Sequence, residues 1–388
     1  MFDAKRMSRI PFSGIRKVFE EVRRRKEGGQ QIVNLGIGRP DFDTPLNIKE
    51  AAKKALDDGH VHYASNYGID ELRQAISVKF KKDNRLDYSA QEEIIVTVGA
   101  NEAVFLTMMA FINPGDEVLV PDPFWPHYFP CVELAGGIPV SVPIREANGF
   151  NPDYKDLKSF CNPKTKLIIV NSPHNPTGAV FRKETLEEIA RLAIEENLMV
   201  MSDEIYENLI YGGQKHISIA TMPGMRKRTI TVNGFSKSYA MTGWRLGYVG
   251  MDKSLMSPMI RAHQYSTVCV STFSQYGATE ALQGPQDDRH KMVAEFSRRR
   301  DLVVSRLGQM KHISYSEPVG AFYVMVNISA TGKSAQEVAS ELLDAGVAVV
   351  PWAAMGKFGS GLIRLSYANS YENLELAMDI MEIYFKSL

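Results

Sequence analysis

The sequence contains few cysteines. Its 388 residues include only three, Cys131, Cys161 and Cys269, and these lie far apart in the chain. Three dispersed cysteines match neither a disulfide framework nor a zinc site, and the eight histidines show no metal-ligand spacing. We therefore expect no metal site, and a reducing, cytoplasmic location for the protein.

Long apolar runs and an excess of charge of one sign are also absent. No stretch approaches the ~18–20 predominantly apolar residues that a membrane span needs. In a secretory signal an apolar segment follows the basic start, and this sequence has no such segment there. The 45 Lys and Arg residues balance the 45 Asp and Glu residues. Nucleic acids and anionic membranes attract a basic surplus, so we expect neither as a partner.

The chain does have the length and the apolar content for a large core. Hydrophobic residues make up 44% of it and charged residues 23%, an ordinary globular balance. At about 150 residues per domain, the length predicts two domains or three.

Short apolar runs alternate with helical stretches in the middle of the chain. The runs are continuous, as in strands that are buried on both faces, and cover residues 94–98, 118–120, 167–170, 198–201 and 229–232. Residues 183–197 follow the helical period, and Thr185 with Glu188 fits a capping box near the start of that helix. Alternating strands and helices predict an open α/β fold with a mostly parallel sheet.

The last hundred residues have a different pattern, which predicts a smaller α+β domain. Helical periodicity predicts helices, and apolar runs predict strands between them. The expected order is a helix at 290–307, a strand at 320–327, a helix at 334–345, a strand at 347–350 and a helix at 371–387. The turn-forming pair Gly284-Pro285 is a candidate boundary before this region.

Polar residues follow four of the predicted strands, where an open α/β sheet binds its ligands. They are Gly99-Ala100-Asn101 at a helix start, Asn175 in a proline-rich turn, Asp203 with Tyr206, and Ser236-Lys237 followed by Arg245. Each signal is weak alone, since a lone lysine, for example, is nearly always a solvated surface charge. Together they fit the partners that a pyridine cofactor with an aldehyde, a phenolic oxygen and a phosphate requires.

The reactive groups of such a cofactor each have a candidate partner. An aldehyde needs an amine to form a Schiff base, and Lys237 offers one. The ring nitrogen needs a carboxylate that keeps it protonated as an electron sink, and Asp203 is the candidate. The phenolic oxygen needs neutral hydrogen-bond donors, which Tyr206 and Asn175 supply.

The phosphate and the ring face have candidates too. Backbone N–H groups at a helix start, together with the Arg245 guanidinium, suit a phosphate. Trp125 is the candidate aromatic lid over the ring. A dinucleotide is disfavoured, because the fingerprint that begins at Gly36-Ile37-Gly38 has Asp41 where it needs glycine or alanine.

In their joint order and spacing, these motifs resemble those of the class I/II aminotransferases, the fold-type I family that depends on pyridoxal 5′-phosphate. The strongest matches are residues 236–238 with 241–245, 175–178 and 202–206, and the likeness runs from residues 36–42 to 363–368. The resemblance implies a three-layer α/β/α large domain with a mostly parallel sheet over residues 46–285. It also implies an N-terminal arm and small α+β domain built from residues 1–45 and 286–388.

The resemblance also implies roles for individual residues. Lys237 is the Schiff-base lysine and general base, Asp203 the pyridinium partner, and Asn175 and Tyr206 the ligands of the phenolic oxygen. Arg364, helped by Gly38 and Asn175, holds the substrate carboxylate. The residues implied for the phosphate are Gly99, Ala100, Asn101, Ser236, Arg245 and Tyr63. Tyr63 serves the neighbouring subunit in the family, which implies a homodimer with shared active sites.

The side-chain preference depends on other positions. Aspartate-preferring relatives place a lysine where Asn101 stands and a threonine near Ile15. Phe12 and Ile15, with Trp125 and Tyr128, are candidates for an apolar side-chain pocket, although Phe12 and Ile15 equally suit an anchor for the N-terminal arm. We therefore expect transfer of an amino group from aromatic L-amino acids, or from a broad range of them, to a 2-oxo acid. The expected acceptor is 2-oxoglutarate, in a ping-pong reaction.

Other functions on the same fold stay open. One is an aminotransferase for aspartate or for an N-acyl-diaminopimelate-type substrate. Another is a C–S lyase, because the cofactor supplies the electron sink and the site decides which bond breaks. A non-catalytic ligand-sensing protein is disfavoured, since no basic recognition helix precedes the catalytic region.

Overall fold

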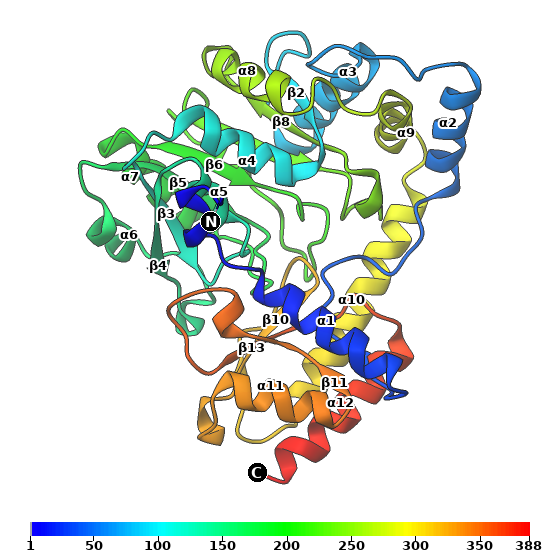
Figure 1. Ribbon diagram of the computed structural model, residues 1–388, viewed down its shortest axis with the longest axis vertical. Coiled ribbons are helices and arrows are strands. Elements are labelled where there is room, and N and C mark those ends of the chain that lie inside the picture. Colours follow the sequence, from blue (N-terminus) through cyan, green and yellow to red (C-terminus); the bar gives the residue numbers. More distant parts are fainter. Residues whose placement is uncertain (1) are drawn as a thin grey trace.

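A seven-stranded sheet forms the centre of the larger part of the molecule in the computed structural model, which describes residues 2–388 (Figure 1). The strands are β2 (Ile94–Thr97), β3 (Glu117–Asp122), β4 (Ile138–Pro143), β5 (Thr165–Asn171), β6 (Met199–Asp203), β7 (Thr229–Gly234) and β8 (Gly247–Met251). They lie in the order β2-β8-β7-β6-β5-β3-β4, and only β8 runs antiparallel to its neighbours. The predicted mostly parallel sheet is confirmed, although the sequence reading missed β4 and β8.

Alternate side chains of each central strand enter different cores, which makes the larger part three-layered. In β5, Leu167 and Ile169 pack with α4, α5 and α8, whereas Ile168 and Val170 pack with α6 and α7. The helices of this part are α2 (Leu46–Asp57), α3 (Asp70–Lys79), α4 (Gly99–Phe111), α5 (Tyr128–Leu134), α6 (Tyr154–Phe160), α7 (Lys183–Glu195), α8 (Met256–Ser266) and α9 (Thr272–Gln283). Because both faces of the sheet are covered, its strands are continuous apolar runs.

The start of α7 differs from the prediction. The helix begins at Lys183, and its N-cap, Arg182, makes no side-chain capping bond. Thr185 is therefore already inside the first turn, where its hydroxyl bonds to Asn151 Oδ1 at 3.2 Å. The predicted capping box is wrong, because this threonine links the helix to a neighbouring loop rather than capping it.

The smaller part combines both ends of the chain. β1 (Val33–Asn34) pairs with β11 (Val347–Ala348), and a separate sheet has the order β12-β13-β10-β9. Its strands are β9 (Ser314–Tyr315), β10 (Tyr323–Asn327), β12 (Val350–Pro351) and β13 (Leu362–Ser366), and the helices are α1 (Gly14–Glu27), α10 (Asp287–Leu307), α11 (Ala335–Asp344) and α12 (Tyr371–Lys386). The single strand predicted at 347–350 is wrong, since a break after Ala348 sends its halves into different sheets. The domain boundaries at residues 45 and 285 stay a prediction.

The arrangement of the two parts places several strand ends opposite the smaller sheet. The carboxyl ends of β5, β6 and β7 and the start of α4 all face the sheet that contains β10 and β13 (Figure 1). Within residues 2–388, no helix is both long and apolar enough to span a bilayer.

Candidate active site

A cavity lies where the carboxyl ends of the central strands meet the smaller sheet. Its lining includes eleven of the residues that the sequence predicted for the site: Gly38, Ala100, Asn101, Trp125, Asn175, Asp203, Tyr206, Ser236, Lys237, Arg245 and Arg364. Ile15 and Tyr128, which the sequence suggested for a side-chain pocket, also line it. Residues more than three hundred positions apart thus share one cavity, as expected for a ligand site at the carboxyl edge of an α/β sheet.

Lys237 follows β7 and extends into this cavity. Its Nζ donates a hydrogen bond of 2.5 Å to the carbonyl oxygen of Gly38. Burial, assisted by the positive charges of Arg245 and Arg364, lowers the pKa of Lys237 to about 8. An amine with such a pKa loses its proton readily near neutrality, which suits a nucleophile and a base.

Asp203 ends β6 and is almost completely buried. Its Oδ2 accepts a hydrogen bond of 2.7 Å from the Tyr128 hydroxyl, and its Oδ1 accepts one of 3.3 Å from the Ile205 N–H. Burial raises the pKa of Asp203 to about 6, while the Tyr128 bond opposes this rise. A buried carboxylate with so few partners favours a cationic group beside it.

Arg364, in β13, lies at the other end of the cavity. Its Nη1 donates to Asn175 Oδ1 at 3.1 Å and its Nη2 donates to the Gly36 carbonyl at 2.8 Å. Its Nε is buried and has no hydrogen-bond partner. The guanidinium is thus oriented by neutral groups, and its charge is available for a carboxylate ligand.

The start of α4 forms a cradle with Arg245. Gly99 has φ +72°, and a Cβ at this position would lie 2.6 Å from Arg245 Nη2. Only glycine therefore lets the guanidinium approach the helix start so closely. The first N–H groups of an α-helix point at this position without helical partners, so the cradle suits a phosphate.

The balance of charge in the cavity tests whether the proposed cofactor fits. Three cations line the cavity, Lys237, Arg245 and Arg364, against a single acid, Asp203. Among residues 2–388, neither arginine forms an ion pair with a carboxylate. A dianionic phosphate, a substrate carboxylate and a protonated ring nitrogen that faces Asp203 would together balance these charges. The residues present fit pyridoxal phosphate together with an amino acid.

Comparison with known proteins agrees with this geometry. The family model described as "Aminotransferase class I and II" matches residues 30–380.

The chain belongs to the class I and II aminotransferases.

Its relatives carry two substrate names. An aspartate aminotransferase of Pyrococcus abyssi is 47% identical over 97% of this chain and 96% of its own. An aromatic-amino-acid aminotransferase of Thermococcus litoralis is 46% identical over 98% and 97%. The solved aromatic aminotransferase from Pyrococcus horikoshii is 46% identical, has a TM-score of 0.90, and covers 94% of this chain and 99% of its own. The protein is a pyridoxal-phosphate-dependent transaminase.

Three of the predicted residues do not line the aminotransferase cavity. Gly99 lies behind it, against Arg245. Phe12 is 86% exposed and precedes α1, so it does not contribute to the side-chain pocket of this chain. Tyr63 is 87% exposed and lies with Cys269 and Phe273 at a separate surface hollow. Within its own chain, Tyr63 is therefore not a cofactor ligand.

The structure adds cavity residues that the sequence reading missed. They are Phe19, Gly36, Asn171, Ile205, Thr242 and Tyr323. Four of them stand inside or beside the sequence motifs, so their position in the sequence could have indicated that they line the cavity: Gly36, Asn171, Ile205 and Thr242. Phe19 and Tyr323 belong to α1 and β10, and no local motif marks either of them.

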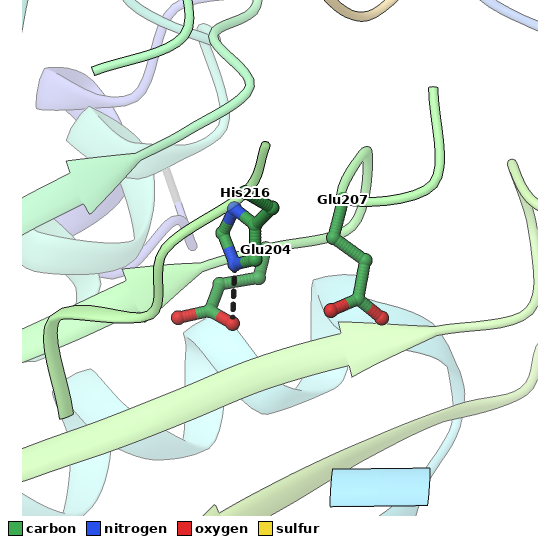
Figure 2. Close-up of side chains that lie close together, drawn as sticks. All are labelled: Glu204, Glu207 and His216. Atoms are coloured by element: carbon green, nitrogen blue, oxygen red, sulfur yellow. Dashed lines mark hydrogen bonds and ion pairs between the residues drawn. The ribbon is translucent and has the colours of Figure 1, made fainter. Parts of the chain in front are cut away.

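A buried charged cluster lies beside the cavity, on the segment that holds Asp203 and Tyr206. Glu204, Glu207 and His216 have ligand atoms within 4.8 Å of one another (Figure 2). His216 Nε2 lies 2.8 Å from Glu204 Oε2, and the buried Lys79 ammonium pairs with Glu207. Because a lysine already supplies a cation to these carboxylates, we assign no metal ion to the cluster.

Proposed function

We propose that this aminotransferase acts on aromatic L-amino acids, or on a broad range that includes them, with 2-oxoglutarate as acceptor. The observation that carries the choice of an aromatic donor is the lining of the cavity, whereas 2-oxoglutarate as acceptor rests on the habit of the family. The three cations of the cavity are all accounted for by the cofactor and the α-carboxylate, and no fourth cation lines it within residues 2–388. Ile15, Phe19 and Trp125 instead offer apolar surface to a side chain.

The proposed roles follow from the positions of the residues. Pyridoxal phosphate, when bound, supplies an aldehyde carbon and an electron-accepting ring. Asp203 holds a proton on the ring nitrogen, and Tyr206 and Asn175 donate hydrogen bonds to the phenolic oxygen. Arg364 fixes the substrate carboxylate and thereby the Cα–H bond. Lys237 Nζ would bond to the aldehyde carbon and would move the proton of the substrate Cα, as covalent partner, base and acid.

The same proposal extends to assembly and location. The start of α4, Ser236 and Arg245 hold the phosphate, and Tyr63 of a second copy completes that site, so the enzyme is a homodimer. The exposed Tyr63, which lies at a surface hollow with Val270 and Phe273, supports this arrangement. The few unpaired cysteines support a cytoplasmic location.

A panel of amino donors tests the substrate class. The enzyme loaded with pyridoxal phosphate is mixed with L-phenylalanine, L-tyrosine, L-aspartate and an N-succinyl-diaminopimelate, and the change in cofactor absorption on amination is followed. We expect a higher kcat/KM for the aromatic donors. Preference for L-aspartate or for the acylated donor contradicts the proposed substrate class. Ammonia release without stoichiometric exchange of 2-oxo acids indicates a lyase, and absence of any half-reaction indicates a sensor.

Substitution of the lysine tests the reaction itself. Lys237→Ala removes the amine that forms the Schiff base and moves the proton, so turnover is abolished. Lys164→Ala, which removes an exposed lysine far from the cavity, is the matched control and keeps full activity. Retained turnover in Lys237→Ala contradicts the assignment.

A further inference from the structure

Tyr323 connects the two ends of the active site, although no motif marked it. Its side chain is 1% exposed at the start of β10 and lines the cavity. In the pairing of β10 with β13, Tyr323 is opposite Ser366 and Met325 is opposite Arg364. Tyr323 and Arg364 are therefore diagonal neighbours on one face of the sheet, within reach of each other.

The ring of Tyr323 supports the carboxylate-binding arginine. Arg364 Cζ lies 4.5 Å from the ring centroid, a cation–π distance. Asn175 and Gly36 hold the guanidinium by its two terminal nitrogens. The aromatic ring is thus a third support, and it limits movement of the guanidinium out of its plane.

The hydroxyl of Tyr323 reaches the other end of the site. Its Oη lies 2.9 Å from Tyr206 Oη, and either hydroxyl can donate in an isolated pair. If Tyr206 donates its only proton to the phenolic oxygen of the cofactor, then Tyr323 must be the donor in this pair. A hydroxyl that accepts a hydrogen bond becomes a stronger donor itself, so Tyr323 strengthens the bond from Tyr206.

The same hydroxyl also restricts which residue can stand at position 38. A Cβ added to Gly38 would lie 2.4 Å from Tyr323 Oη, but 3.4 Å from Cζ and 3.7 Å from Cε1. The hydroxyl oxygen alone, and not the ring, therefore excludes a side chain at this position. Gly38 also accepts the hydrogen bond of Lys237, so its backbone belongs to the site.

We propose that Tyr323 is a positioning residue of this aminotransferase. Its ring orients Arg364 for the substrate carboxylate, and its hydroxyl orients Tyr206 toward the phenolic oxygen and requires glycine at position 38. The inference rests on the proposed function of Tyr206 and Arg364, and extends it to a residue that contacts both.

A spectroscopic titration tests the hydroxyl. Tyr323→Phe keeps the ring and removes the donor to Tyr206. Tyr211→Phe is the matched control, because that buried hydroxyl donates to the Ala321 carbonyl at 2.5 Å outside the cavity. The visible absorption of the loaded enzymes is followed against pH.

We expect the pH midpoint of the absorption change to rise by about 0.5–1 unit in Tyr323→Phe, because the phenolate loses support. The midpoint stays at the wild-type value in Tyr211→Phe. An unchanged midpoint in Tyr323→Phe overturns the proposal. Failure of the proposed function is a distinct result, since wild-type enzyme would then show no amination of the cofactor by any donor.

A double-mutant cycle tests the contact with Gly38. The probe is 3-phenylpropionate, a carboxylate without an amino group, and its Kd is measured from the absorption of the bound cofactor. We expect Gly38→Ala to weaken binding about tenfold or more and Tyr323→Phe about two- to threefold. The double variant binds more tightly than Gly38→Ala alone, because the clashing oxygen is gone. Effects that simply multiply overturn the proposal.

Discussion

The hydroxyl of Tyr128 donates a hydrogen bond of 2.7 Å to Oδ2 of Asp203, and both side chains are buried. Tyr128 begins α5 and Asp203 ends β6, so a helix on one face of the sheet orients the carboxylate at its edge. The phenol stabilises the charged form of Asp203 against the effect of burial, which raises the pKa of this carboxyl to about 6.

Tyr128→Phe will raise the pKa of Asp203 further, because the charged form loses a donor. The carboxylate must be ionised to hold a proton on the ring nitrogen. As the pH falls, the variant therefore loses activity at a higher pH than wild type does. We expect the acidic limb of the kcat/KM profile to move up by about one unit. Tyr211→Phe, which loses a buried hydroxyl elsewhere, serves as control, and identical acidic limbs would contradict the role of Tyr128.

Three of the cavity residues that the sequence predicted share one physical origin. Asn175, Asp203 and Lys237 follow buried parallel strands, and the carboxyl ends of such strands meet at one edge. Local patterns sufficed to place them, since a continuous apolar run followed by polar residues marks each strand end. The resemblance to the family, which runs from residues 36–42 to 363–368, also implied a smaller part built from both ends of the chain.

Tyr323 and Phe19 could not be predicted in this way. The strand that contains Tyr323 was expected, but its pairing with the strand of Arg364 joins segments forty residues apart and has no local signature. Phe19 faces the cavity only because α1 packs across the smaller part. The capping box predicted at Thr185 is wrong for a related reason. The local capping pattern is present, but the hydroxyl of Thr185 bonds to Asn151, which belongs to another segment.

Asn101→Lys will shift the substrate preference toward aspartate. Asn101 is exposed and lines the cavity mouth at the start of α4, so a lysine there adds the cation that the cavity lacks for a second carboxylate. We expect the ratio of kcat/KM for L-aspartate over L-phenylalanine to rise about five- to tenfold, which corresponds to one partly exposed charged contact. Asn101→Gln is the neutral control, and an equal ratio in both variants would count against the pocket.

Asp122 links the large sheet to the segment after β12. It is fully buried at the end of β3, and its Oδ2 accepts a hydrogen bond of 2.7 Å from the Lys357 N–H. A Cβ at Gly356 would lie within 2.1 Å of Asp122 Oδ1. Burial raises the pKa of Asp122 from 3.8 to about 6, so folding favours its protonated form and its contribution to stability is lost as pH rises through this window.

Asp122→Asn will make the free energy of unfolding less dependent on pH between about 4 and 6. The amide oxygen still accepts from Lys357, and the variant does not ionise, so at pH 7 it is more stable than wild type by up to about 3 kcal/mol. Gly356→Ala, by contrast, destabilises by about 1–3 kcal/mol through overpacking. Urea denaturation at pH 4, 5, 6 and 7 measures both effects, and parallel pH curves for wild type and Asp122→Asn would refute the first.

His216 balances a buried charge beside the site. Figure 2 shows His216 beside the two carboxylates, Glu204 and Glu207. These carry two negative charges and Lys79 carries one positive charge, so a protonated His216 makes the cluster neutral. Although burial lowers the pKa of His216, the charge and hydrogen bond of Glu204 and the charge of Glu207 outweigh it and raise this pKa above its usual value. The stabilisation is fully present below about pH 6.5 and is lost as pH rises through the raised value.

His216→Gln will destabilise the enzyme by about 3 kcal/mol at pH 6, where the ion pair is intact in wild type. Above the raised pKa the difference between the two proteins narrows, because wild type has also lost its positive charge. Thermal unfolding from pH 6 to 9 measures this convergence. His290→Gln, at an exposed position of α10, is the control and follows wild type throughout. A constant difference at all pH values would show that His216 acts by packing alone.

Tyr63 and Lys237 test the shared active site of the proposed homodimer. Tyr63→Ala weakens the phosphate site that it completes, and Lys237→Ala removes the reaction, so each homodimer loses activity. In a mixed dimer, the Tyr63→Ala chain keeps its own Lys237, and the Lys237→Ala chain supplies an intact Tyr63 to that chain's site. One of the two sites in the mixed dimer is therefore wild type. Random mixing on co-expression makes half of the dimers mixed, so activity recovers to about a quarter of wild type. If Tyr63 served its own chain, no mixed dimer would contain an intact site, and activity would not exceed the mean of the two variants.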